Sequence, residues 1–160
     1  MRIILTIFVS MFTIVTYVAN AQDKKSITIG SFLLTTEKDP FGDHDTVVAM
    51  AISGTDVVAL RCIENTLSLA IASKDHPITV GEVYSVKFRA DDKQIFDEVG
   101  HAINESIIDV STNADAMIDQ VNGAKIIAIR ITGDNSSYTF TVPVRQADKV
   151  VPLVKKACGR

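Results

Sequence analysis

The sequence TVVAMAISGTDVVALRCIENTLSLAI, residues 46–71, decides the fold class. It contains three short runs of apolar and β-branched residues, and the pairs Gly54-Thr55 and Glu64-Asn65 separate them. Gly, Asn and Asp are common in turns, and runs of this length between turns are typical of antiparallel strands. The stretch therefore predicts three consecutive strands joined by hairpins.

The same pattern continues on both sides of this stretch. Apolar and polar residues alternate at residues 27–33, 84–88, 127–131 and 138–142, which predicts further strands. Apolar positions three and four residues apart predict one helix over 114–121, capped by Asn113 and ended by Gly123, and another over 147–158. Pro152 would kink this second helix or lie near its start.

These elements predict a mainly β fold with minor α (α+β). Strands outnumber helices and follow one another in hairpin order. The expected architecture is an antiparallel β-sandwich or open barrel with one or two helices packed on one side.

The first residues resemble an export signal. Arg2 precedes an almost wholly apolar run over residues 3–18, and the small-residue triplet Ala19-Asn20-Ala21 follows. This order predicts a cleaved signal peptide over residues 1–21 and a single domain over 22–160. A membrane anchor is the alternative, but the run is shorter than the ~20 residues that span a bilayer. We therefore expect a periplasmic protein with no membrane attachment after cleavage.

The charge of the mature chain argues against nucleic acid as a partner. Removing Arg2 changes the formal net charge from −3 to −4. Nucleic-acid binding relies on basic side chains that neutralise phosphates, so an acidic domain disfavours it.

The two cysteines, Cys62 and Cys158, predict a disulfide. An even number of cysteines in an exported chain is typical of a bonded pair. A catalytic thiol and a metal site remain as alternatives, although two cysteines without a well-placed histidine make a poor zinc site.

Arg61 precedes Cys62 on a strand that is expected to be mostly buried. Its neighbours on the same face of the strand are apolar, and a buried arginine usually pairs with a carboxylate. The candidate partners are Asp43, Asp45 and Asp91. The alternative is that Arg61 faces a ligand and binds it through its fork of donors.

The sequence contains no recognisable catalytic or metal-binding motif. His44, His76 and His101 lie in no metal-ligand spacing, and there is no serine-nucleophile motif or phosphate-binding glycine loop. Residues 39–45 contain three carboxylates and His44. One interpretation is a divalent-cation site, and the alternative is a solvated loop. We expect no cofactor, no metal and no enzymatic activity.

Four stretches, taken together, resemble a known family. They are residues 36–40 with Asp43 and 45–48; Leu60-Arg61-Cys62 with Asn65-Thr66; VKFRADD at 86–92; and Tyr138-Thr139-Phe140 with Ala157-Cys158-Gly159. In this order they are similar to the type VI secretion system-associated periplasmic proteins (TagO/VasI-like domain), a family with stand-alone relatives outside secretion loci. The resemblance implies a periplasmic, non-enzymatic accessory domain with bridged cysteines.

The resemblance also predicts which residues act together. Arg61, Asp43, Asp45, Arg89 and Asp91 lie in the matched stretches, and we expect a polar network or binding site near the Cys62 strand. The predicted function is a periplasmic accessory or binding protein whose partner is an envelope protein or peptidoglycan. The alternative is a small inhibitor of an envelope hydrolase, similar to lysozyme inhibitors, in which the loop at residues 39–45 would plug the catalytic cleft.

Overall fold

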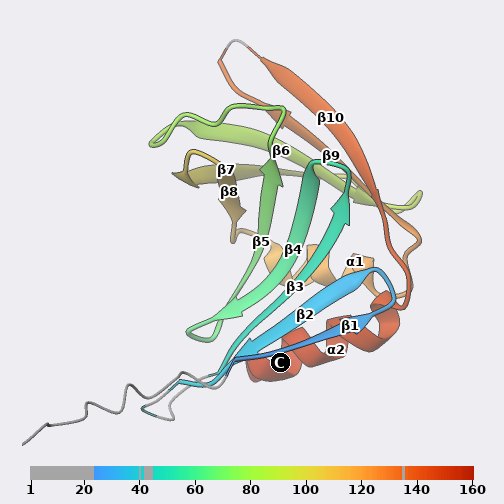
Figure 1. Ribbon diagram of the computed structural model, residues 1–160. Helices are drawn as coiled ribbons and strands as arrows, with labels where there is room; N and C mark the ends of the chain where they lie inside the picture. Colours follow the sequence, from blue (N-terminus) through green and yellow to red (C-terminus); the bar gives the residue numbers. More distant parts are fainter. Residues whose placement is uncertain (1–23, 40, 42–44, 135) are drawn as a thin grey trace, which may run out of the picture.

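The computed structural model describes residues 24–39, 41, 45–134 and 136–160 (Figure 1). The strands are β1 (Lys24–Ile29), β2 (Phe32–Glu37), β3 (Thr46–Ser53), β4 (Asp56–Ile63), β5 (Thr66–Ser73), β6 (Val83–Ala90), β7 (Phe96–Asn104), β8 (Ile107–Val110), β9 (Ile126–Thr132) and β10 (Ser137–Pro143). The helices are α1 (Ala114–Val121) and α2 (Ala147–Ala157). The predicted signal peptide, residues 1–21, lies outside the described residues.

All of these strands belong to one antiparallel sheet. Their order across the sheet is β1-β2-β3-β4-β5-β8-β7-β6-β9-β10, and the sheet is open. The predicted mainly β fold with helices is therefore confirmed, and it takes the form of an open, curved sheet.

The predicted turns at residues 54–55 and 64–65 join β3 to β4 and β4 to β5. Glu64 and Asn65 both have positive φ, at 49° and 59°. Two consecutive residues with positive φ form the hairpin turn whose twist matches that of antiparallel strands. The register follows directly, with Ser53 opposite Asp56 and Ile63 opposite Thr66.

The stretch at residues 27–33 forms two strands rather than one. The chain reverses at Gly30 and Ser31, so that Ile29 lies opposite Phe32. Gly30 has a φ of 60°, a conformation that residues with a Cβ atom rarely adopt. The glycine that seemed part of an alternating pattern is the turn itself.

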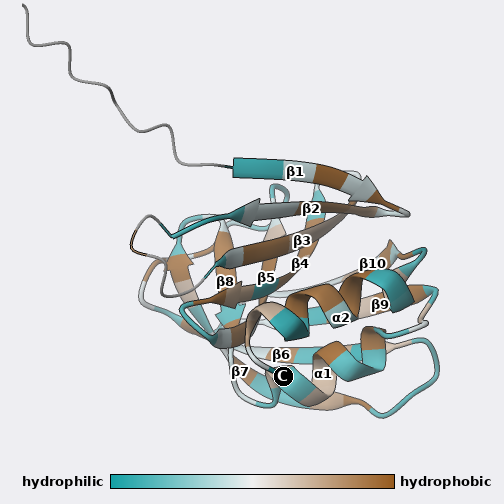
Figure 2. Cartoon of the chain, turned by 90° about the horizontal axis from the view of Figure 1, so that it is seen from below, coloured by the Kyte–Doolittle hydropathy of each residue, from teal (hydrophilic) through white to brown (hydrophobic). Residues whose placement is uncertain are grey.

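The sheet bends so that its two halves enclose the helices at one end (Figures 1 and 2). We call β1–β5 the first wing and β6–β10 the second wing. α2 packs on β2, β3 and β4, while α1 packs on β5 and β6, and the two helices contact each other. Across the open side, β10 contacts β3 and β4, and the Tyr138 hydroxyl donates to the Asp56 carboxylate over 3.1 Å.

The core lies between the inner face of the sheet and the helices. The helices contribute Ala114, Met117, Ile118, Val121, Ala147, Val150, Val151 and Val154. The sheet contributes the inward residues of each strand, of which the largest fully buried ones are Phe32, Leu60, Leu69, Ile71, Phe88, Ile108, Ile127, Ile129 and Ile131. Because side chains alternate along a strand, the residues between them point to the outer face of the sheet, away from the helices.

Candidate functional site

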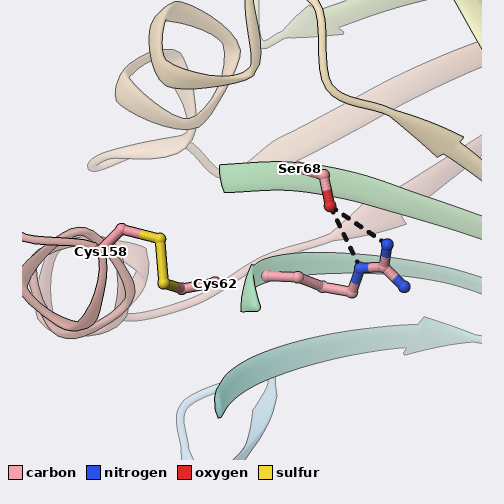
Figure 3. The surroundings of a disulfide bond; sticks show 4 residues. Cys62, Ser68 and Cys158 are labelled. Carbon is pink, nitrogen blue, oxygen red and sulfur yellow. Dashed lines mark hydrogen bonds between the residues drawn. A yellow bond between two sulfur atoms is a disulfide. The ribbon is translucent and has the colours of Figure 1, made fainter. Parts of the chain in front are cut away.

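The predicted disulfide between Cys62 and Cys158 is confirmed (Figure 3). Cys62 lies on the inner face of β4 and is fully buried, and Cys158 follows the last turn of α2. The Cα atoms are 5.7 Å apart. The bond therefore fixes the end of α2 against the first wing, and it leaves no free cysteine in the described residues.

Arg61 forms an ion pair on the outer face of the first wing. Its guanidinium donates to the Asp109 carboxylate over 2.5 Å and to the Ser68 hydroxyl over 3.2 Å and 3.3 Å. The side chains of Arg61 and Asp109 are only 14% and 22% exposed. A partly buried salt bridge is thus present, and its carboxylate comes from β8 rather than from any of the three predicted partners.

The predicted partners lie elsewhere or outside the described residues. Asp43 is not among the described residues, and Asp45 is exposed just before β3. Asp91 lies in the turn after β6 with a φ of 49°. Its carboxylate accepts the backbone N–H groups of Lys125 and Ile126 over 2.9–3.2 Å, so it anchors the start of β9.

The structure does not bring Arg61 together with Arg89. Four strand spacings separate β4 from β6 in the sheet, which corresponds to roughly 19 Å along its surface. Arg89 lies on the outer face of the second wing, where it belongs to a different cluster of side chains.

Arg89 lines a pocket on the outer face of β6, β9 and β10, which run side by side in Figure 1. The pocket has a volume of about 270 Å³, and most of its surface is apolar. We call it the Arg89 pocket, and its lining residues are Lys87, Phe88, Arg89, Ile95, Ala128, Ile129, Arg130 and Thr139.

The register of the strands explains why three cations meet there. Lys87 and Arg89 are successive outward residues of β6, and Arg130 is an outward residue of β9. Lys87 lies directly opposite Arg130, while Arg89 lies opposite the small residue Ala128. Like charges directly opposite each other destabilise a sheet, and the carboxylate of Asp97 beside Lys87 offsets part of this cost.

Only part of this positive charge is compensated within the described residues. Lys87 forms an ion pair with Asp97, and hydrogen bonds from Lys87 and then Ser85 hold the pKa of the Asp97 carboxyl below its usual value. Arg130 donates to the Thr139 hydroxyl, which is neutral. Arg89 makes no side-chain hydrogen bond or ion pair among the described residues, so two guanidinium charges lack a carboxylate there.

Sequence reasoning identified Arg89 but missed Lys87, Arg130 and Asp109. The sequence held a signal for the first two. Lys87 stands between the apolar residues of β6, and Arg130 stands between the isoleucines of β9, so both are expected on the polar face of their strand. No local pattern shows that β6 pairs with β9, and therefore no pattern in the sequence alone places Arg130 beside Lys87.

The chain has no detected relative that would assign a function to these residues. No protein-family model, curated protein or solved structure significantly matches it. Among the described residues, no group of three or more His, Cys, Asp or Glu side chains is arranged to hold a metal ion. Within the same residues, no helix is long and apolar enough to cross a bilayer.

Proposed function

We propose that this protein is an exported, non-enzymatic binding protein of the bacterial cell envelope, and that the Arg89 pocket is its binding site. The observation that carries the proposal is the cluster of Lys87, Arg89 and Arg130 around an apolar cavity. The chain has a net charge of −3, so three cations on one pocket stand out against the acidic remainder. Such a pocket favours a partner that presents negative charge.

Export is the second part of the proposal. The apolar run and the Ala19-Asn20-Ala21 triplet support cleavage before Gln22. The disulfide supports an oxidising compartment, because structural disulfides are rare in the bacterial cytosol. Association with a type VI secretion system is supported by the sequence resemblance, and peptidoglycan or an envelope protein is the partner proposed.

The test is a pulldown with tagged residues 22–160 as bait. Envelope extract and purified peptidoglycan serve as parallel sources, and three baits are compared: the native sequence, Arg89→Gln and Lys156→Gln. Lys156 is exposed on α2 and away from the pocket. Lys156→Gln therefore removes one positive charge, as Arg89→Gln does, without changing the pocket.

The proposal predicts that the native and Lys156→Gln baits capture the same partner and that Arg89→Gln loses it. Capture that does not depend on Arg89 would refute the binding site, and no capture from either source would refute the proposed partner. Capture of one hydrolase whose activity falls on binding would instead support the inhibitor function. The export part is checked by determining the N-terminus of the protein isolated from the periplasmic fraction. The mature protein should begin at Gln22.

A further inference from the structure

We infer that the Arg89 pocket binds an oxyanion carried on a short apolar group, that is, a carboxylate or phosphate monoester next to a few carbon atoms. This inference rests on the proposed function, which makes the pocket the binding site, and it adds the chemical class of the ligand. It follows from three properties of the pocket: its charge, its apolar wall and its size.

The charge of the pocket selects an anion with several acceptor atoms. Arg89 and Arg130 each present a planar fork of N–H donors, and such forks match carboxylate and phosphate oxygens. Lys87 is already paired with the carboxylate of Asp97. The ligand would therefore bind mainly to the two guanidinium groups.

The apolar wall selects what the anion is attached to. Ala128 has a small side chain, and it lies opposite Arg89 at a position where a larger residue would fill the space. Ile95, in the turn after β6, is 56% exposed and forms another wall of the pocket. A free inorganic anion would leave these apolar surfaces in water, whereas a ligand with a small alkyl group would cover them.

The volume limits the part of a ligand that the pocket can hold to a small group. Pockets for drug-sized ligands have volumes of ≈ 300–1,000 Å³, and the Arg89 pocket, at about 270 Å³, lies just below that range. It has room for one or two amino-acid units or a short alkyl chain. A larger partner would insert only its terminal group.

The experiment titrates small probes into the protein of residues 22–160. Binding is measured by calorimetry and by backbone amide NMR. The probes are N-acetyl-alanyl-alanine, its C-terminal amide, butyl phosphate and inorganic phosphate. The first and third probes distinguish a carboxylate from a phosphate source, the amide removes the charge, and inorganic phosphate removes the apolar group.

Two variants test the charge and the apolar wall separately. Arg89→Gln removes one guanidinium from an exposed position, and Ala128→Val fills the pocket without changing the charge. Valine is favoured in strands, so the second variant should fold. Lys156→Gln is again the charge-matched control.

We expect at least one of the two amphipathic oxyanions to bind, with amide shifts confined to β6, β9, β10 and the turn at residues 91–95. Both pocket variants should weaken it about tenfold or more, and Lys156→Gln should have no effect. Added salt should also weaken binding, because the pocket is open to solvent. Equal binding of the amide, equal binding of inorganic phosphate, or no shift at these residues would overturn the inference.

The outcome separates this inference from the proposed function. If the pulldown fails but the oxyanion binds through Arg89, the pocket has the inferred ligand class and the envelope partner is wrong. If the pulldown succeeds through Arg89 but no small oxyanion binds, the site is correct and the ligand class is wrong.

Discussion

Among the described glycines, Gly30 leaves the least room for a side chain. A Cβ atom there would lie 2.0 Å from the carbonyl oxygen of Arg145. The same oxygen accepts a hydrogen bond from the Ser31 N–H over 3.2 Å. Gly54 has nearly the same φ, at 61°, but a Cβ atom there would meet nothing within 4 Å. A substitution at Gly54 therefore reports backbone strain alone, whereas one at Gly30 adds a steric clash.

We expect Gly54→Ala to lower the free energy of unfolding by about 1 kcal/mol, the cost of a left-handed alanine. Gly30→Ala should cost at least about 2 kcal/mol more, because a backbone carbonyl group cannot move as a side chain can. Urea unfolding followed by circular dichroism measures both. Equal losses would show that the turn at Gly30 relaxes away from Arg145.

The ion pair of Arg61 and Asp109 provides a second test at this scale. The variants are Arg61→Met, Asp109→Asn and the double variant, and the exposed pair Lys87–Asp97 is the control. We expect a coupling free energy of about 1–2 kcal/mol for the partly buried pair and less than about 1 kcal/mol for the exposed pair. Similar coupling in both pairs would contradict the role assigned to burial.

At the level of single residues, the sequence indicates which side chains form the ion pair better than it indicates their partners. The alternation around Cys62 placed Arg61 on an enclosed strand, and a carboxylate partner was expected on physical grounds. The partner could not be identified, because Asp109 is 48 residues away and joins Arg61 only through the pairing of β5 with β8.

At the scale of elements, Lys155 links the two helices. This residue of α2 pairs with Asp119 over 2.6 Å and with Asp115 over 3.1 Å, both on α1. The hydrogen bond to Asp119 is the main reason that the pKa of Lys155 is raised. The link therefore stabilises the folded protein as long as the ammonium group keeps its proton.

This link predicts a loss of stability at alkaline pH. Because the folded pKa lies above the unfolded pKa, the stabilisation is complete below the unfolded value and disappears as the pH rises through the folded one. Lys155→Met should lower the free energy of unfolding by about 0.5–1 kcal/mol at pH 8. The difference between the native protein and the variant should shrink as the pH rises through the folded pKa of Lys155. Urea midpoints measured at increasing alkaline pH test this, with Lys156→Met as the control.

Elements with strong local signals were predicted well. α1 occupies the predicted residues 114–121, and the predicted hairpins β3–β4, β4–β5 and β9–β10 are confirmed. Asn113 occupies the N-cap position, but its side chain donates to Glu98 instead of capping the helix. The sequence predicts no strand at β7 or β8, because both faces of β7 mix polar and apolar residues, Gly100 interrupts β7, and β8 has only four residues.

At the scale of the whole molecule, the disulfide is the main covalent constraint. Its cysteines are 96 residues apart in sequence and join the first wing to the last helix. Replacing Cys62 and Cys158 with alanine should lower the free energy of unfolding by about 2–5 kcal/mol. A reductant should destabilise the native protein and leave the variant unchanged. A reductant effect on the variant would show that the loss has another origin.

The topology is the part of the fold that the sequence could not provide. Hairpins follow from local turns, but the pairings of β5 with β8 and of β6 with β9 join strands that are distant in the chain. These pairings create the ion pair of Arg61 and the Arg89 pocket. The candidate site therefore depends on contacts that no local pattern encodes.

The disulfide also divides the chain into segments inside and outside a covalent ring. A protease that cuts at Phe41, which is 87% exposed, would separate β1 and β2 from the ring. Under denaturing conditions that fragment would be released without any reductant. A cut in the turn at residues 91–95 lies inside the ring, so the two pieces would stay joined until the disulfide is reduced. Paired gels with and without reductant would therefore map each cleavage site to one side of Cys62.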